Sequence, residues 1–340
     1  GDPDPAMTWS RGRRALWILI PVAAALFLVS LVVGRYGVRP IETLRALFGR
    51  AGSSDVLRAL ILRVRLPRTL AAACVGANLA VSGAVLQGVF RNPLVDGRVL
   101  GVSSGAAFGA ALALSLAGGA AAVQGMSFLF ALAAVGLVAW IGWRFGAAPL
   151  ILVVGGIAVS ALFDALVGLI KYAADPLSRL PAITYWLLGG LSGSRWTTLV
   201  PLIAVTAVGL VFFGLFSWRL NLLTLCDAEA ASLGVRVRPQ RIVVIGAATV
   251  LIAASVSASG MIGWIGLVVP HVARAWVGAD HQRLIPASAV LGAATLIGLD
   301  LIARTALPSE IPLGILTGLI GIPAFLLLFL RLVRSRGAER

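Results

Sequence analysis

Lysine, histidine, cysteine and charge in general are scarce in this chain of 340 residues, and each scarcity excludes a class of function. The only lysine, Lys171, does not follow a glycine, so the chain lacks a Gly-Lys-Ser/Thr phosphate loop and is not itself a P-loop ATPase. The only histidines, His271 and His281, have no cluster of cysteines or carboxylates beside them, so we expect no metal site. No nucleophile is paired with a base. We therefore expect a protein that is not an enzyme and holds no cofactor of its own.

Apolar residues are what the chain has in abundance. They make up 59% of it, the mean hydropathy is +1.00, and only 12% of the residues are charged. Soluble domains carry about 25% charged residues, so this composition predicts an all-α integral membrane protein. The net charge of +15 comes from arginines that lie between apolar runs. This placement favours contact with lipid headgroups at the bilayer surface, and we expect no nucleic-acid partner.

The hydropathy pattern predicts about ten transmembrane helices in one polytopic domain over residues 7–340. Residues 1–6 precede Met7 and are interpreted as a cloning remnant. A short half-inserted helix is expected over residues 182–191, and the glycine-rich eighth span is expected to be irregular. The ten predicted spans are 15–34, 69–90, 99–118, 120–143, 148–171, 197–217, 242–259, 261–273, 285–304 and 313–332.

The distribution of basic residues predicts that both termini are cytoplasmic. With this orientation 16 basic residues lie inside and 12 outside, and eight of the 12 fall within residues 35–68. Without that segment the bias is a clear positive-inside pattern. The segment is either an amphipathic hairpin on the headgroups or a docking surface for an acidic partner, and the charge pattern favours neither interpretation.

The second span, residues 69–90, is rich in alanine, glycine and serine, which suits close packing against other helices in lipid. In the fifth span Asp164 is the main intramembrane carboxylate. It is either an ion relay of a secondary transporter or a packing group bonded to neighbouring helices. Residues 224–234 predict a short inner helix that ends at Gly234; it is either a surface connector or a contact for a partner.

Several segments together resemble the FecCD family, the permease subunits of type II ABC importers for iron chelates, haem and vitamin B12. The resemblance runs in family order across nearly the whole chain. It is carried by the segments Arg65-Leu66-Pro67-Arg68, Gly76 to Gly83 with Gln87, Arg91-Asn92-Pro93-Leu94, Leu100-Gly101 with Gly105-Ala106, Gly260 to Leu267 with Pro270-His271 and Arg274, and Asp300 to Arg304 with Glu310 to Gly314. The chain departs from the family pattern at Val95-Asp96-Gly97 and at Trp264, with little change in size or turn character.

The resemblance implies a BtuC-like permease fold, in the inner membrane of a bacterium. It also implies a homodimer of this chain, two cytoplasmic ATPase subunits that bind ATP and Mg, and a periplasmic substrate-binding protein. Docking of the binding protein is implied for Arg65, Arg68 and Arg304. Contact with the ATPase is implied for Asp227, Ala228, Ala230, Leu233 and Gly234, and a cytoplasmic gate for Asn92 and Leu94. A second gate loop aligns with Ala148, although the hydroxyl residues of the family are absent there.

The resemblance also implies that the cargo crosses by alternating access. The fifth span, its following short helix and the tenth span are implied as walls of the cavity. Haem or a ferric siderophore is the expected cargo, because the absence of acidic residues in the implied cavity and the basic outer face fit an anionic cargo. Cobalamin and an oxyanion of the molybdate type are the alternatives within the family, and an ion-coupled secondary transporter that uses Asp164 is the alternative from another class.

Overall fold

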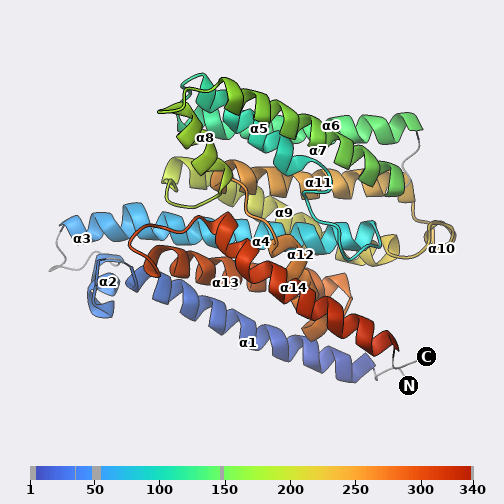
Figure 1. Cartoon of the computed structure of the whole chain (residues 1–340). Helices are drawn as coiled ribbons and strands as arrows, with labels where there is room; N and C mark the ends of the chain where they lie inside the picture. Colours follow the sequence, from blue (N-terminus) through green and yellow to red (C-terminus); the bar gives the residue numbers. More distant parts are fainter. Residues whose placement is uncertain (1–4, 35, 48–54, 146–148, 338–340) are drawn as a thin grey trace.

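The computed structural model describes residues 5–34, 36–47, 55–145 and 149–337, and these residues form a bundle of helices (Figure 1). The helices are α1 Pro5–Val32, α2 Pro40–Leu47, α3 Asp55–Ala59, η1 Leu60–Arg65 (a π-helical turn), α4 Leu66–Val89, α5 Val102–Ser115, α6 Ala120–Phe145, α7 Pro149–Ala173, α8 Arg179–Leu187, α9 Trp196–Leu223, α10 Asp227–Ser232, α11 Val237–Ser259, α12 Ile265–Val277, α13 His281–Thr305 and α14 Leu313–Gly337.

Each of the ten predicted spans has a helix in the structure. In the described part of the chain six helices are long and apolar enough to cross a bilayer, and four shorter apolar helices lie within α1, α5, α12 and α14. Two span predictions begin too early, because residues 99–101 and 261–264 are loops. Left-handed glycines explain these breaks: Gly101 has φ 76° just before α5, and Gly260 has φ 67° just after α11. The predicted half-inserted helix is α8, which starts and ends a few residues earlier than expected.

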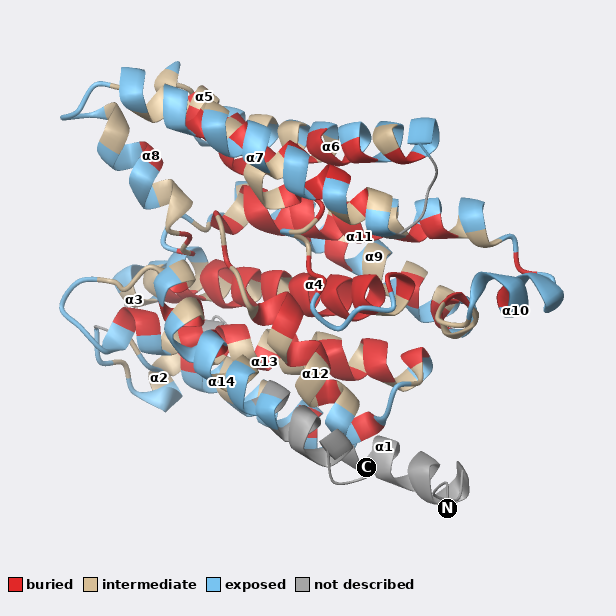
Figure 2. Cartoon of the chain, turned by 45° about the vertical axis from the view of Figure 1, so that its right-hand side comes forward, coloured by how far each residue is buried: buried red, intermediate tan, exposed pale blue. Residues whose placement is uncertain are grey.

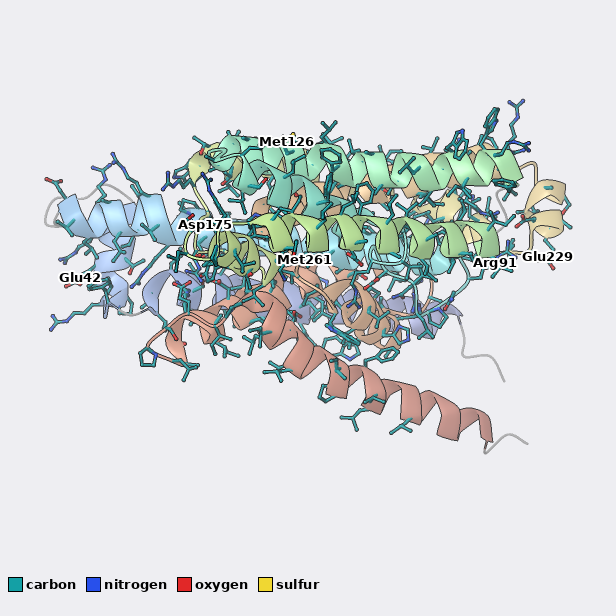
Figure 3. All side chains as sticks on the ribbon, turned by 45° about the horizontal axis from the view of Figure 1, so that its top comes forward. Glu42, Arg91, Met126, Asp175, Glu229 and Met261 are labelled. Atoms are coloured by element: carbon teal, nitrogen blue, oxygen red, sulfur yellow. The ribbon has the colours of Figure 1, made fainter. Side chains whose placement is uncertain are left out.

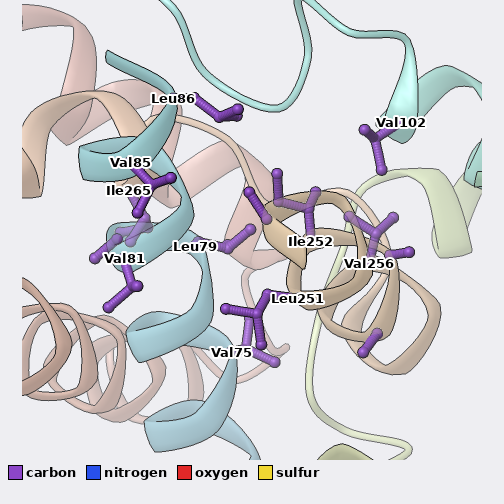
Figure 4. Close-up of a cluster of buried hydrophobic side chains, with 14 of the residues drawn as sticks. Val75, Leu79, Val81, Val85, Leu86, Val102, Leu251, Ile252, Val256 and Ile265 are labelled. Atoms are coloured by element: carbon purple, nitrogen blue, oxygen red, sulfur yellow. The ribbon is translucent and has the colours of Figure 1, made fainter. Parts of the chain in front are cut away.

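Helix α4 lies at the centre of the bundle (Figure 2). In the span that contains it, 83% of the apolar window is buried inside the chain. Figure 4 shows Val75 and Leu79 of α4 in one cluster of buried side chains with Leu251 and Ile252 of α11. A helix that is apolar on all sides is expected to be surrounded by other helices, and α4 has this position.

Glycines bring α4 against two neighbouring helices. A Cβ atom on Gly76 would overlap the backbone of Gly292 in α13, and one on Gly83 would overlap the backbone of Gly266 in α12. Small residues at such contacts let helix backbones approach closely where no hydrophobic effect drives association. The close packing predicted for residues 69–90 is therefore confirmed.

The helices give the bundle two ends. In Figure 1 α1 begins and α14 ends on the side where α10 lies, whereas α2, α3 and α8 lie on the opposite side. Glu42 and Asp175 mark that opposite side in Figure 3, and Arg91 and Glu229 mark the side of α10. We call the end with Glu42 the outer end and the end with Glu229 the inner end, following the charge bias of the sequence.

Candidate translocation pathway

The outer end carries a helix that is too long for the membrane. α3, η1 and α4 form one continuous helical segment of 35 residues, Asp55–Val89. Such a segment is about 52 Å long, whereas the hydrocarbon core is about 30 Å thick. Its first turns therefore project beyond the bilayer, and they present the exposed side chains of Arg58 and Arg63. Together with Arg45 of α2 they form a basic outer surface.

Arg65 does not belong to that surface, although the resemblance implied a docking role. Its side chain is buried and donates hydrogen bonds to the backbone oxygens of Leu31 at 2.8 Å, Val32 at 2.6 Å and Tyr36 at 2.6 Å. These bonds satisfy carbonyls at the end of α1, where a helix leaves its last oxygens without internal partners. Arg65 thus ties the end of α1 to η1.

Arg68 is also buried, in an ion cluster with α13 and the loop that follows it. Its Nη2 lies 2.9 Å from Oδ1 of Asp300, and its Nη1 lies 2.9 Å from Oε1 of Glu310. Asp300 is fully buried, and Arg304 approaches it at 3.7 Å. Charge-assisted bonds of this kind hold a buried carboxylate that would otherwise be strongly disfavoured.

Arg304, the third implied docking residue, faces α1. Its Nη2 donates to the backbone oxygen of Ser30 at 2.6 Å and to the Ser30 hydroxyl at 2.7 Å. That hydroxyl also lies 2.9 Å from the hydroxyl of Thr69 in α4. Each of the three guanidinium groups is thus bonded inside the chain. The docking role itself is untested and stays a prediction.

Arg98 is one of the 16 basic residues that the charge pattern places at the inner side, but its loop lies at membrane depth. Helix α5 has 14 residues, so it covers about 21 Å of a core of about 30 Å, and the loop before it extends into the bilayer region. Arg98 is in this loop. Non-helical backbone at that depth is tolerated where it is buried in protein or lines a water-filled cavity.

Arg98 lines such a cavity, of about 330 Å³, where the end of α8, the loop before α12 and the start of α14 converge. Its guanidinium carbon lies 5.0 Å from the centre of the Trp264 ring, and its Nε donates to Asp96 at 2.9 Å. Trp264 has φ 70°, which is strained for a bulky residue and is typical of functional sites. The hydroxyl-bearing Ser103 lines the same cavity. In Figure 3 Met261, another lining residue, lies between the two ends of the bundle.

Asp164 is exposed on α7, and it forms no hydrogen bond or ion pair with any residue in the described part of the chain. Packing against neighbouring helices of the same chain therefore does not account for this carboxylate. Ionisable residues in membrane spans nearly always face a bundle interior or a water-filled cavity and avoid lipid. The Asp164 face of α7 is therefore a surface that water or another protein chain covers.

The implied gate residues lie in the turn after α4, at the inner end. Asn92 and Leu94 are both exposed, and Oδ1 of Asn92 accepts a hydrogen bond from the backbone of Leu94 at 2.9 Å. Asn92 also borders a hollow of about 330 Å³ with Arg274 and His281. The bond fixes the turn that presents Leu94, whose gating role is untested. Ala148 lies outside the described residues.

Helix α10 is anchored through its first residue. Asp227 pairs with Arg91, which follows α4, and with Arg241 of α11 at 2.9 Å. The hydrogen bond from Arg241, with a further contribution from Arg91, holds the pKa of the Asp227 carboxyl below its usual value. Glu229 accepts from the backbone of Cys226 at 3.3 Å, which caps the helix start.

The rest of α10 separates into an inward and an outward face. Ala230 is fully buried against the bundle, while Ala228 and Leu233 are exposed, Leu233 at 60%. Gly234 has φ 79° and ends the helix as predicted. Of the five residues implied for contact with an ATPase, Asp227 and Ala230 thus anchor the helix, and Ala228 and Leu233 provide a small apolar surface.

A polytopic helical bundle with a cavity at membrane depth and an anchored inner helix defines a membrane permease. The comparison with known families agrees, because the model of the FecCD transport family matches residues 22–331, and this chain belongs to that family. Members of the family are permease subunits of ABC importers, and are not enzymes themselves.

Two curated relatives and one solved structure illustrate the similarity. The chain is 40% identical to the molybdate import system permease protein MolB of Haemophilus influenzae, over 94% of this chain and 95% of that protein. It is 38% identical to the hemin transport system permease protein HmuU of Yersinia pestis, over 90% of this chain and 93% of that protein. A solved ABC transporter in an inward-facing conformation is 38% identical, with a TM-score of 0.86 over 94% of this chain and 99% of that one. The relatives' names differ in cargo.

Proposed function

We propose that this chain is the membrane-spanning subunit of an importer that moves an anionic iron chelate, haem or a ferric siderophore, inward across a bacterial inner membrane. Two copies would enclose the path, two ATPase subunits would supply the energy, and a periplasmic binding protein would deliver the cargo. Family membership sets aside the ion-coupled transporter that would use Asp164 as its relay.

The observation that carries the anionic cargo is Arg98. Its side chain is 45% exposed in a cavity at membrane depth. A guanidinium offers several donors in a plane and binds carboxylates and other oxyanions bidentately. Asp96 engages only the Nε side of the group, so its two Nη atoms would be left for an anionic cargo. The Trp264 ring beside it adds an apolar surface for a planar or hydrophobic chelate.

An oxyanion is the second candidate, and two observations favour it. The relative with molybdate in its name is similar over almost the full length of both chains. The cavity of about 330 Å³ in one chain is near the small end of the range of about 300–1,000 Å³ for ligand sites. A homodimer would join two such cavities at its axis, which would admit haem as well.

The exposed face of α7 supports the homodimer. Asp164 needs water or protein beside it, and Val154 and Ile157 of the same helix are 57% and 58% exposed. A second copy that leaves a water-filled path along α7 meets both needs, because it buries apolar residues and keeps the carboxylate hydrated. At the inner end, Leu233 and Ala228 would seat on an ATPase subunit, while Asp227 would transmit the movement through Arg91 to the turn after α4 and through Arg241 to α11.

For the outer end we propose that Arg58 and Arg63 meet carboxylates of the binding protein, because they are exposed on turns that project from the bilayer. Arg65, Arg68 and Arg304 would then hold these turns in position. Contacts between exposed charges set orientation and on-rate more than affinity. Charge reversal at Arg58 and Arg63 should therefore slow the association of the binding protein. The rates of the other transport steps should not change.

Uptake in proteoliposomes tests the proposal. The permease is reconstituted with its ATPase and binding protein, and ATP-dependent accumulation of haem, a ferric siderophore, molybdate and cobalamin is measured. One anionic cargo should accumulate, and Arg98→Gln should reduce its uptake while Arg98→Lys retains part of it. Preferential uptake of cobalamin, or uptake that Arg98→Gln does not change, would contradict the anionic-cargo proposal. Accumulation without ATP would contradict the importer class.

A further inference from the structure

A second large cavity lies away from the path, among the inner ends of α6, α7 and α11. It has a volume of about 420 Å³ and an almost entirely apolar lining. Along α6 it extends from Val135 to Trp143, which corresponds to about 12 Å of helix. Along α11 it extends from Arg238 to Gly246. Neither the translocation pathway nor the anchoring of α10 requires an empty groove at this place.

Glycines keep this groove open. Gly136 of α6 and Gly246 of α11 both line it, and a Cβ built at either position meets no atom of the described chain within 4 Å. Both residues are exposed, as is Ile242 between them on the groove wall. A membrane-exposed apolar groove of this length does not stay empty in a bilayer, because packing in lipid depends on van der Waals contact.

The inner mouth of the groove carries the charge that identifies its occupant. Arg238 lines the mouth and its side chain is exposed. Arg241 also lines the groove, but it is buried and committed to Asp227. Trp143 is 71% exposed at the same level, in the position where aromatic residues meet headgroups. Basic pockets between transmembrane helices at the cytoplasmic side bind anionic lipid headgroups.

We propose that this groove is a binding site for an anionic phospholipid of the inner leaflet. One acyl chain lies between α6 and α11 along the two glycines, and the phosphate group pairs with Arg238. Charge complementarity selects an anionic lipid over a zwitterionic one, and the apolar wall selects a lipid over a free phosphate. The proposal is independent of the cargo, because it involves none of the residues of the pathway.

Native mass spectrometry of the intact transporter complex tests the site with two probes, phosphatidylglycerol and phosphatidylcholine with identical acyl chains. One arginine near a membrane surface contributes about 1 kcal/mol, so binding of phosphatidylglycerol should exceed that of phosphatidylcholine about fivefold. Arg238→Gln should abolish this preference. The matched control is Arg236→Gln, because Arg236 is exposed two residues away and does not line the groove. Equal loss in both variants would show diffuse attraction and overturn the site.

A second experiment fills the groove with a side chain. Gly246→Leu adds a side chain whose Cβ meets no atom of the described chain within 4 Å, and it should displace both lipids. Gly214→Leu on α9 is the control, since Gly214 has the same open surroundings and lies outside the groove. Retention of phosphatidylglycerol in Gly246→Leu would overturn the proposal. So would a disulfide cross-link between two copies of the chain that carry Ile242→Cys or Gly246→Cys, because a protein surface would then occupy the groove.

Discussion

Replacing Asp300 by asparagine should destabilise the helical bundle without any change at its surface. The carboxylate is fully buried and accepts hydrogen bonds from the Arg68 guanidinium at 2.9 to 3.1 Å. Asparagine has a similar shape but no charge, so Arg68 would keep only Glu310, which lies at the edge of the cluster with 28% of its side chain exposed. The buried charge of Arg68 would then lose the carboxylate that offsets most of its desolvation cost.

The expected magnitude follows from the burial of both partners. Removing one member of a buried ion pair costs about 3–5 kcal/mol, because the remaining charge stays buried without a partner. Replacing both members by apolar residues of similar size is close to neutral. Thermal unfolding of the detergent-solubilised protein should therefore show a large loss for Asp300→Asn and a clear recovery for Arg68→Met combined with Asp300→Leu.

Two outcomes would refute this reasoning. Asp300→Asn could unfold at the wild-type temperature, which would mean that Arg68 does not depend on the carboxylate. Alternatively, the double variant could be as unstable as the sum of its single variants, which would mean that the pair is not coupled. Arg63→Gln is the control, because its side chain is exposed in the same segment and should leave unfolding unchanged.

Three further predictions concern glycine contacts and α10. Gly292→Ala should destabilise the bundle because its new Cβ overlaps α4. Gly298→Ala on the same helix has open space around its Cβ, so it should leave stability unchanged or raise it by up to about 1 kcal/mol through helix propensity. Thermal unfolding of the two variants tests this difference. Since the pKa of Asp227 is lowered in the folded chain, its stabilisation of α10 is present above the unfolded value of 3.8 and is lost as the pH falls below it. The protection factors of the amides in residues 224–236, which correct for the pH dependence of intrinsic exchange, should therefore fall as the pH drops below about 3.8, and should be low already at neutral pH in Asp227→Asn. Leu233→Asp should weaken co-purification of the ATPase subunit, and an equal effect of Leu215→Asp, on the exposed side of α9, would contradict the contact.

The number and approximate limits of the spans could be predicted from the sequence, because twenty-residue apolar runs have few alternatives. The limits failed where a single backbone angle decided them. Gly101 and Gly260 adopt positive φ values and convert predicted helix into loop. A glycine in an apolar run does not reveal whether it packs against a neighbour, as Gly83 does, or turns the chain.

The side of the membrane on which a charge lies was easier to predict than its exposure. Arg68 and Arg304 stand in the predicted outer region, but their partners Asp300 and Ser30 come from helices far away in sequence. Arg98 was counted as an inner loop residue, although the shortness of α5 places its loop at membrane depth. For Arg68 a signal was available in the sequence. Asp300 was a carboxylate in an apolar span, and such a residue needs a cationic partner.

The contacts of α4 with its neighbours suggest a hypothesis about which helices would move together during transport. At the outer end Arg68 joins α4 to α13, and at the inner end Gln87 accepts from Arg274 of α12 at 3.1 Å. Between them, backbones meet at Gly76 and Gly83 with no side chain that could slide. We infer that α4, α12 and α13 form a rigid unit. Tightly packed interfaces of this kind do not deform continuously. Alternating access would therefore require movement of helices that have exposed faces, such as α7 and α14.

Hydrogen exchange in the complete transporter, with and without ATP, tests whether α4, α12 and α13 stay rigid while other helices move. Amides of α4 should be protected equally in both states, because its contacts persist, whereas exchange should change in α10 and at the ends of α7. A nucleotide-dependent change in the middle of α4 would contradict the rigid unit. It would also place the gate at Leu94 on a moving helix, since the turn that presents Leu94 follows α4 directly. With α4 fixed, we predict that a gate at Leu94 would open when α10 moves Arg91 through its ion pair with Asp227.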